Sequence, residues 1–167
     1  MPIKQDELIH KQFIIALKEQ GITVRNANEA SSIVDDKNFA NAILRLGTNH
    51  RNIYILICQD KVVIIHLHIR SEGSGFWGLT KSTLDHVKLF KEKLKIPNWL
   101  VLLVGRQDNF IADGYIITEI GKSPMTKQLT LLANGGYRIN EKQDLNSCKK
   151  IRSIKMIVSK IEKLILD

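Results

Sequence analysis

The apolar run Trp-Leu-Val-Leu-Leu-Val at residues 99–104 restricts the fold more than any other feature of the chain. It has the length of a strand and follows Pro97, and it is far shorter than the roughly 20 residues that cross a bilayer. A strand that is apolar at every position is typical of one buried on both faces in the middle of a sheet. We therefore expect residues 99–104 to form a central strand.

Strand and helix signals are interspersed along the rest of the chain. Two β-rich runs that meet at a polar turn predict a hairpin of residues 52–60 and 61–70. Apolar residues at helical spacing predict helices at residues 6–20, 80–94 and, with many basic residues, 148–166. Shorter signals predict strands at 22–27 and 114–120 and short helices at 35–46 and from Pro124. This order predicts a mixed α/β fold, with residues 1–167 forming a single domain in which a central mixed sheet is flanked by helices.

Composition and charge narrow the class of protein. A hydrophobic fraction of 44% and a charged fraction of 25% are typical of a folded soluble chain, and the charged N-terminus does not resemble a signal peptide, so we expect a cytoplasmic protein that does not enter membranes. Cys58 and Cys148 form no CxxC pair, which argues against a disulfide framework and a thiolate zinc site. The net charge of +8 favours a polyanionic partner, with nucleic acid as the first interpretation and an anionic membrane surface as the alternative.

The strand expected at residues 61–70 changes character along one of its faces. Because side chains alternate in a strand, one face is apolar throughout, whereas the other begins apolar and ends with His66, His68 and Arg70. Two interpretations remain open: these are half-exposed residues at an edge of the sheet, or they converge on a phosphate, for which Arg offers forked donors and His can shuttle a proton. A zinc site on the two histidines is a third interpretation, but the sequence shows no further ligands for it.

A glycine-containing loop follows this strand and leads to an aromatic pair. Residues 71–75 read Ser-Glu-Gly-Ser-Gly, and Phe76 and Trp77 come directly after them. Exposed aromatic rings can stack on bases, whereas buried rings anchor a segment in the core. We favour the anchor.

The order of these elements resembles that of the PD-(D/E)XK nuclease-like superfamily, which includes restriction and homing endonucleases and Holliday junction resolvases. The stretch that corresponds to the superfamily motif of an acid or Gln, any residue and Lys is His68-Ile69-Arg70-Ser71. The resemblance covers about residues 50–120 and rests on order and spacing. It implies a restriction-endonuclease-like fold and hydrolysis of phosphodiester bonds with magnesium held by carboxylates.

The chain departs from that motif in three places. His68 stands where an acid is usual and is a poor ligand for Mg²⁺, which prefers oxygen. Arg70 keeps the charge of the usual Lys but cannot act as a base. The preceding strand, beginning Asn-Ile-Tyr-Ile at residues 52–55, carries no carboxylate. The nearest acids in sequence are Asp35, Asp36, Asp60 and Glu72.

These observations lead to three hypotheses about function. The first is a small metal-dependent endonuclease of the restriction, homing or repair type that acts on double-stranded DNA as a homodimer. In it Arg70 contacts the scissile phosphate, His68 carries a proton, and Glu72 and Asp36 contact a magnesium ion. The second is an inactive DNA-binding or structural subunit with the same fold, and the third is a protein-interaction module. The residues assigned to nucleic-acid binding are His66, Lys81, Lys149, Lys150 and Arg152.

Overall fold

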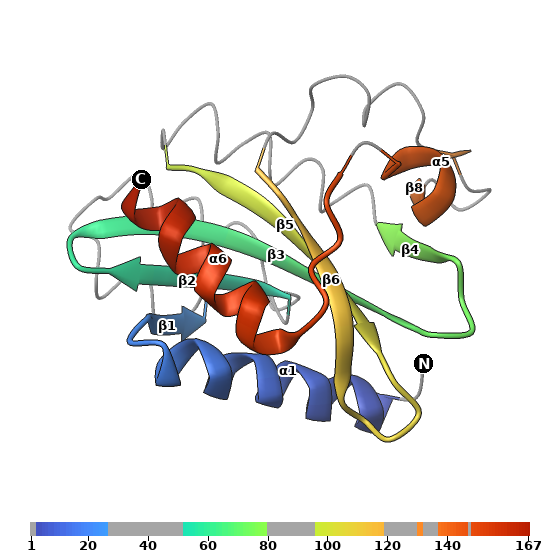
Figure 1. The fold of residues 1–167 in the computed structure, drawn as a ribbon, viewed down its shortest axis with the longest axis horizontal. Helices are drawn as coiled ribbons and strands as arrows, with labels where there is room; N and C mark the ends of the chain where they lie inside the picture. Colours follow the sequence, from blue (N-terminus) through green and yellow to red (C-terminus); the bar gives the residue numbers. More distant parts are fainter. Residues whose placement is uncertain (1–2, 27–51, 80–95, 119–129, 132–136, 147) are drawn as a thin grey trace.

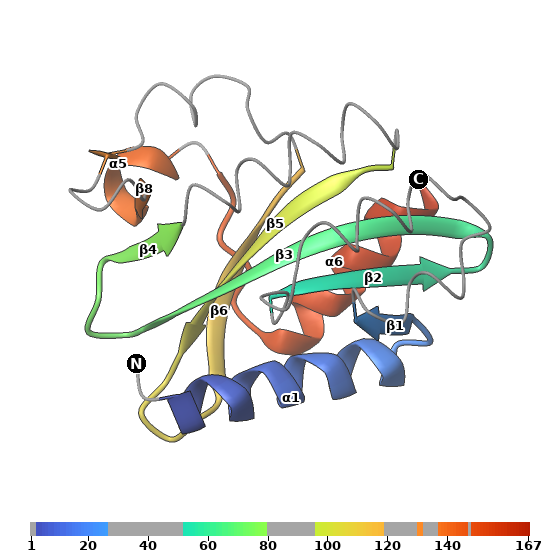
Figure 2. The ribbon, with the colours of Figure 1, turned by 180° about the vertical axis from the view of Figure 1, so that it is seen from behind.

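The computed structural model describes residues 3–26, 52–79, 96–118, 130–131, 137–146 and 148–167. Figure 1 shows a large twisted sheet with two helices, α1 and α6, on one of its faces, and Figure 2 shows the same sheet from behind. The elements are α1 (Ile3–Glu19), β1 (Thr23–Asn26), β2 (Ile53–Cys58), β3 (Lys61–Ser71), β4 (Phe76–Leu79), β5 (Asn98–Gly105), β6 (Ile111–Ile117), β7 (Thr130–Leu131), β8 (Tyr137–Asn140), α5 (Glu141–Asp144) and α6 (Ile154–Leu166).

The main sheet is mixed and has the strand order β1-β2-β3-β5-β6. Only β3 and β5 run parallel among these neighbours, and the other adjacent pairs are antiparallel. The expected hairpin is confirmed as β2 and β3, and Gln59 takes a φ of 57° in the turn between them. A second sheet has the order β4-β8-β7. The expectation of a mixed α/β fold with a central mixed sheet and flanking helices is therefore confirmed.

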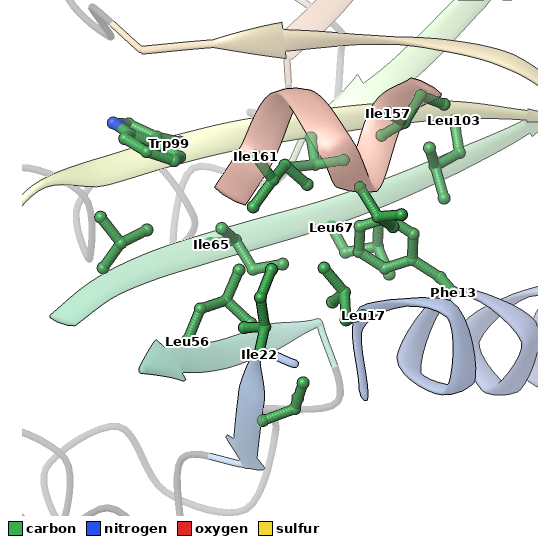
Figure 3. Packing of buried hydrophobic residues seen from close by; sticks show 14 of the residues in the cluster. Phe13, Leu17, Ile22, Leu56, Ile65, Leu67, Trp99, Leu103, Ile157 and Ile161 are labelled. Carbon is green, nitrogen blue, oxygen red and sulfur yellow. The ribbon is translucent and has the colours of Figure 1, made fainter. Parts of the chain in front are cut away.

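The main sheet is packed on both of its faces. On one face, α1 and α6 place Phe13, Leu17 and Ile161 against Ile65 and Leu67 of β3 (Figure 3). On the other face, residues of the smaller sheet and the residue after α5 pack against the main sheet as a second apolar cluster. In it Trp77, Leu79, Ile139 and Leu145 meet Leu100, Leu102, Val104, Tyr115 and Ile117. Every residue of β5 is buried, so the prediction of a central strand from its continuous apolar run is confirmed.

The aromatic pair after β3 belongs to strand β4. Trp77 is 1% exposed, and its indole Nε1 donates a hydrogen bond to the backbone carbonyl of Leu103 at 2.9 Å. The interpretation of Trp77 as a core anchor is therefore confirmed. Phe76 is only partly buried, and the guanidinium of Arg138 lies 3.8 Å from its ring centroid.

The C-terminal helix begins at Ile154 rather than near residue 148, which corrects the predicted range of 148–166. Ser153 is its N-cap, and its side chain accepts a hydrogen bond from the backbone N–H of Met156 at 3.1 Å. The residues before it are held in extended form, because Ile151 and Gly114 of β6 exchange backbone hydrogen bonds of 2.8 and 2.9 Å. Gly114 also permits the close approach of β5 to β6, since an added Cβ would lie 2.6 Å from the carbonyl oxygen of Leu102.

Other boundaries also differ from the sequence predictions. Strand β6 begins at Ile111, three residues before the predicted start at Gly114, because the turn before it closes early with a hydrogen bond from Arg106 N–H to the Phe110 carbonyl at 2.8 Å. The helices expected at 35–46 and at 80–94 lie outside the described residues. Of the helix expected from Pro124 to the turn at 134–136, the structure describes only Thr130–Leu131, which form strand β7 and correct the prediction there. Among the helices that the structure does describe, none combines the length and apolar character needed to span a membrane.

Candidate functional site

The two histidines of β3 lie inside the protein. His66 is 0% exposed and His68 is 8% exposed, because β3 is an internal strand between β2 and β5 and its second face is covered. The interpretation of these histidines as half-exposed residues at a sheet edge is therefore wrong. Asn98 satisfies one ring nitrogen of the buried His66, since its Oδ1 accepts a hydrogen bond from His66 Nε2 at 3.1 Å. The assignment of His66 to nucleic-acid binding stays a prediction, and it requires this side chain to become exposed.

His68 is a buried and neutral imidazole. Burial lowers its pKa from 6.5 to about 3, and the nearby His66 contributes in the same direction. Its Nε2 atom is buried and has no hydrogen-bond partner among the described residues. At neutral pH, His68 therefore carries no charge in the folded protein, and its assignment as a proton carrier stays a prediction.

Arg70 lies at the carboxyl end of β3 and belongs to a group of polar side chains, which we call the Arg70 cluster: Arg70, Asp113, Tyr115, Glu141 and Lys150. The strand register brings Arg70 and Asp113 near each other, because Val104 of β5 pairs with Arg70 of β3 and with Asp113 of β6. In the same way Leu102 separates His68 from Tyr115. The first residue of α5 and the extended segment before α6 bring Glu141 and Lys150 to the same place.

Glu141 is the centre of the cluster. Its Oε2 accepts a hydrogen bond from Arg70 Nη2, and its Oε1 accepts hydrogen bonds from the Tyr115 hydroxyl at 2.9 Å and from Lys150 Nζ at 2.8 Å. Lys150 Nζ also lies 4.0 Å from Asp113 Oδ2. The Glu141 carboxylate thus connects β3, β6 and the segment before α6.

The other terminal nitrogen of Arg70 is also occupied, whereas its buried Nε has no hydrogen-bond partner among the described residues. Nη1 donates to the backbone carbonyls of Ser71, at 2.9 Å, and Ser74. Its carbon Cζ lies 4.6 Å from the centroid of the Trp77 ring, and Trp77 meets Tyr115 edge to face at 5.9 Å. Arg70 is therefore committed to contacts within the protein, and a contact with a phosphate would compete with them.

The cluster changes the acidity of its own members. Burial alone would raise the pKa of Glu141, but the hydrogen bonds from Lys150 and Tyr115 and the charge of Arg70 outweigh it and lower this pKa. Burial raises the pKa of Asp113, an effect that Lys150 opposes and the charge of Glu141 reinforces. Burial and the hydrogen bond to Glu141 raise the pKa of the Tyr115 hydroxyl. The two carboxylates therefore have different acidities, which is an arrangement found at catalytic as well as structural sites.

The described part of the cluster does not fit a magnesium ion. Both oxygens of Glu141 accept hydrogen bonds from cations or a hydroxyl, and the ammonium of Lys150 lies beside Glu141 and Asp113. Within the ranges that the structure describes, no three His, Cys, Asp or Glu side chains are arranged to hold a metal. Asp36, assigned to a metal contact, and Lys81, assigned to nucleic acid, lie outside these ranges.

The other candidate acids near β3 occupy different places. Glu72 is exposed directly after the carboxyl end of β3. Asp60 lies in the turn before β3, about 30 Å from Arg70 at the usual rise of a strand. Of the acids that the sequence analysis named, Glu72 is therefore the one that the described residues place near Arg70.

Sequence reasoning missed Asp113, Tyr115 and Glu141. The spacing of Asp113 and Tyr115 could have indicated them, since residues two apart on a strand lie on the same face. Glu141 carries none, because it follows Arg70 by 71 residues and reaches it only through the packing of the second sheet.

A second candidate site is a group of exposed cations, which we call the basic segment: Lys149, Arg152, Lys155, Lys160 and Lys163. Its helical part lies opposite the buried residues Ile157, Val158, Ile161 and Ile165, which pack α6 onto the sheet. Figure 1 shows α6 beside α1 on one face of the sheet, and Gln20 at the end of α1 donates a hydrogen bond to Glu162 of α6 at 3.3 Å. The basic segment is therefore held on a rigid support.

Comparisons with known proteins give little further information. No family model matches the chain, and no curated protein matches it. One solved structure to which the chain is similar is a Holliday junction resolvase from the archaeal hyperthermophile Archaeoglobus fulgidus. It is 8% identical, with a TM-score of 0.47, and the alignment covers 90% of this chain and 93% of the resolvase.

Proposed function

We propose that this protein binds nucleic acid, and double-stranded DNA in particular, through contacts between its basic segment and the phosphate backbone. The observation that carries the proposal is the exposure of Lys149, Arg152, Lys155, Lys160 and Lys163 in a chain with a net charge of +8. Cations on a rigid surface displace the counterions of a duplex, and this release supplies the binding free energy of sequence-independent contacts.

The spacing of the cations on α6 suits a backbone. Lys155 and Lys163 lie eight residues apart, which corresponds to about 12 Å along a helix axis. That length spans roughly three to four base-pair steps of a duplex at 3.4 Å each. The Lys150 ammonium, in contrast, contacts Glu141 and Asp113, so its contribution to phosphate binding requires it to leave the Arg70 cluster.

Neutralising α6 is expected to weaken binding to a duplex. The variant with Lys155→Gln, Lys160→Gln and Lys163→Gln removes three phosphate contacts without touching the buried face of α6, and we expect at least about tenfold weaker binding near 0.1 M salt. Fluorescence anisotropy with a labelled 20-base-pair duplex measures this change. Lys142→Gln, an exposed lysine on α5, is the control and should bind like the unmodified protein. Equal affinity of the triple variant and the control would contradict the proposal.

A second candidate function is phosphodiester hydrolysis, and one observation favours it. Two carboxylates of different acidity, Asp113 and Glu141, lie beside the cations Arg70 and Lys150 at the carboxyl end of β3. In this candidate function, the protein is a member of the PD-(D/E)XK nuclease-like superfamily, with catalytic roles for Arg70, His68 and Glu72 and a magnesium contact from Asp36. It acts as a homodimer, which offers one site to each strand of a duplex. The order of α1, the antiparallel strands β1 to β3 and the parallel strand β5 supports it.

A plasmid assay tests this candidate. Supercoiled DNA is incubated with the protein in Mg²⁺ or Mn²⁺, with and without a chelator, and the candidate predicts nicking that Glu72→Gln abolishes. Because Glu72 is exposed, this substitution should leave folding and duplex affinity unchanged. Intact plasmid in every condition, with normal duplex binding, would rule out hydrolysis and leave the binding function.

A further inference from the structure

Phe110 is an exposed aromatic side chain at the turn between β5 and β6. It is 59% exposed, whereas most large apolar side chains of the described residues lie in the two clusters on the sheet. Figures 1 and 2 show that the connection between β5 and β6 projects past the end of the sheet, near the N-terminal end of α1. The ring is therefore presented at an extremity of the molecule.

The turn that carries Phe110 is held in one conformation by its own hydrogen bonds. Arg106 N–H donates to the Phe110 carbonyl at 2.8 Å, and Asn109 N–H donates to the Arg106 carbonyl at 3.0 Å. Asp108 accepts from Phe110 N–H at 3.3 Å, and Asn109 takes a positive φ of 66° that closes the turn. A rigid support reduces the entropy lost when an exposed ring binds a partner.

Helix α1 fixes the turn from the side. Gln12 donates a hydrogen bond from its amide to the carbonyl of Asn109, which ties the turn to the helix. Two exposed cations neighbour these residues in the sequence: Arg106 lies at the start of the turn, and Lys11 directly precedes Gln12. Arg106 pairs with Asp108 at 2.8 Å, and because both side chains are about half exposed, this ion pair contributes little to stability.

We propose that Phe110 stacks on an unpaired base of a bound nucleic acid, while Arg106 and Lys11 contact the adjacent phosphates. This inference rests on the proposed nucleic-acid binding and adds a preference for nucleic acids that contain unpaired bases. An aromatic ring stacks on any base that is free of its neighbours, and cations beside it bind the backbone. A fully paired duplex offers no free base face, so it would use the basic segment alone.

The test compares two labelled DNAs that differ only in a bulge of three unpaired thymines within the same 20-base-pair duplex. The unmodified protein should bind the bulged DNA roughly 5- to 150-fold more tightly, the range expected for stacking on one base. Phe110→Ala should lose this preference and keep its affinity for the paired duplex, whereas Phe110→Trp should retain the preference. Ile15→Ala, which shortens an exposed apolar side chain on α1, is the matched control and should behave like the unmodified protein.

Each other result overturns the inference in a recognisable way. If Phe110→Ala and the unmodified protein bind both DNAs equally, the stacking role is wrong, and salt-sensitive duplex binding would still support the proposed function. If neither DNA binds at all, the proposed function fails together with the inference. If Phe110→Ala instead converts a dimer to a monomer in sedimentation, with unchanged DNA binding, the ring belongs to a protein interface that Leu8 and Ile15 would extend.

Discussion

Lowering the pH from 7 to 4 is expected to reduce the free energy of unfolding by about 3 kcal/mol through His68 alone. Burial lowers the pKa of this imidazole from 6.5 to about 3 in the folded protein, whereas the unfolded chain keeps the ordinary value. Between these two values the unfolded state binds a proton that the folded state does not bind. Stability is therefore complete above pH 6.5 and falls as the pH drops toward 3, by up to about 1.4 kcal/mol per unit.

The pH dependence can be assigned to His68 by substitution. Whatever the stability of His68→Leu at pH 7, its free energy of unfolding in urea should lose most of its dependence on pH between 6.5 and 4.5. His10→Asn is the matched control. It removes another histidine whose pKa burial lowers, but the charge of Asp6 opposes that shift, so most of the pH dependence should remain. A His68 imidazole that titrates near 6.5 by NMR in the folded protein would contradict the account.

Replacing Arg70 by Ala is expected to destabilise the protein by roughly 3 kcal/mol. The substitution removes the ion pair with Glu141, the hydrogen bonds to Ser71 and Ser74, and the contact with the face of Trp77. It leaves the Glu141 carboxylate, whose side chain is 17% exposed, with Lys150 and Tyr115 as its partners. Breaking a mostly buried ion pair costs far more free energy than breaking an exposed one, because the charge that remains has lost its compensation.

The exposed ion pair of Arg106 and Asp108 provides the matched control. Its two side chains are 52% and 46% exposed, so Arg106→Ala should cost less than about 1 kcal/mol. Urea unfolding measures the stability of both variants. A double-mutant cycle of Arg70→Ala and Glu141→Gln then separates the energy of the Arg70–Glu141 ion pair from that of the other contacts of Arg70. Equal stability of Arg70→Ala and Arg106→Ala would show that the Arg70 cluster does not hold the two sheets together.

The fold could be predicted where one local pattern decides it. The continuous apolar run of β5 indicated an internal strand, and the polar residues between two β-rich runs indicated the hairpin of β2 and β3. The start of α6 could not be predicted in this way, because Ile151 continues the apolar spacing of the helix but pairs with Gly114 as an extended residue. Tertiary pairing overrode helical periodicity there.

The candidate site could be predicted only in part. The alternation of β3 correctly placed His66, His68 and Arg70 on one face, but it could not show that this face is covered, since the covering strands β4 and β8 come later in the chain. The partner of Arg70 was equally hidden, because Glu141 reaches it through the packing of two sheets. A cluster that is assembled from distant segments has no local pattern in the sequence that could predict it.

The dependence of duplex affinity on salt concentration tests the central claim most directly. If the basic segment binds the phosphate backbone, a plot of the logarithm of the association constant against the logarithm of the salt concentration should be linear. Its slope should be steeply negative, at about −0.9 for each phosphate contacted, and the triple lysine variant should reduce the slope by about 3. A slope near zero, or an equal slope for the unmodified protein and the triple variant, would contradict nucleic-acid binding by this surface.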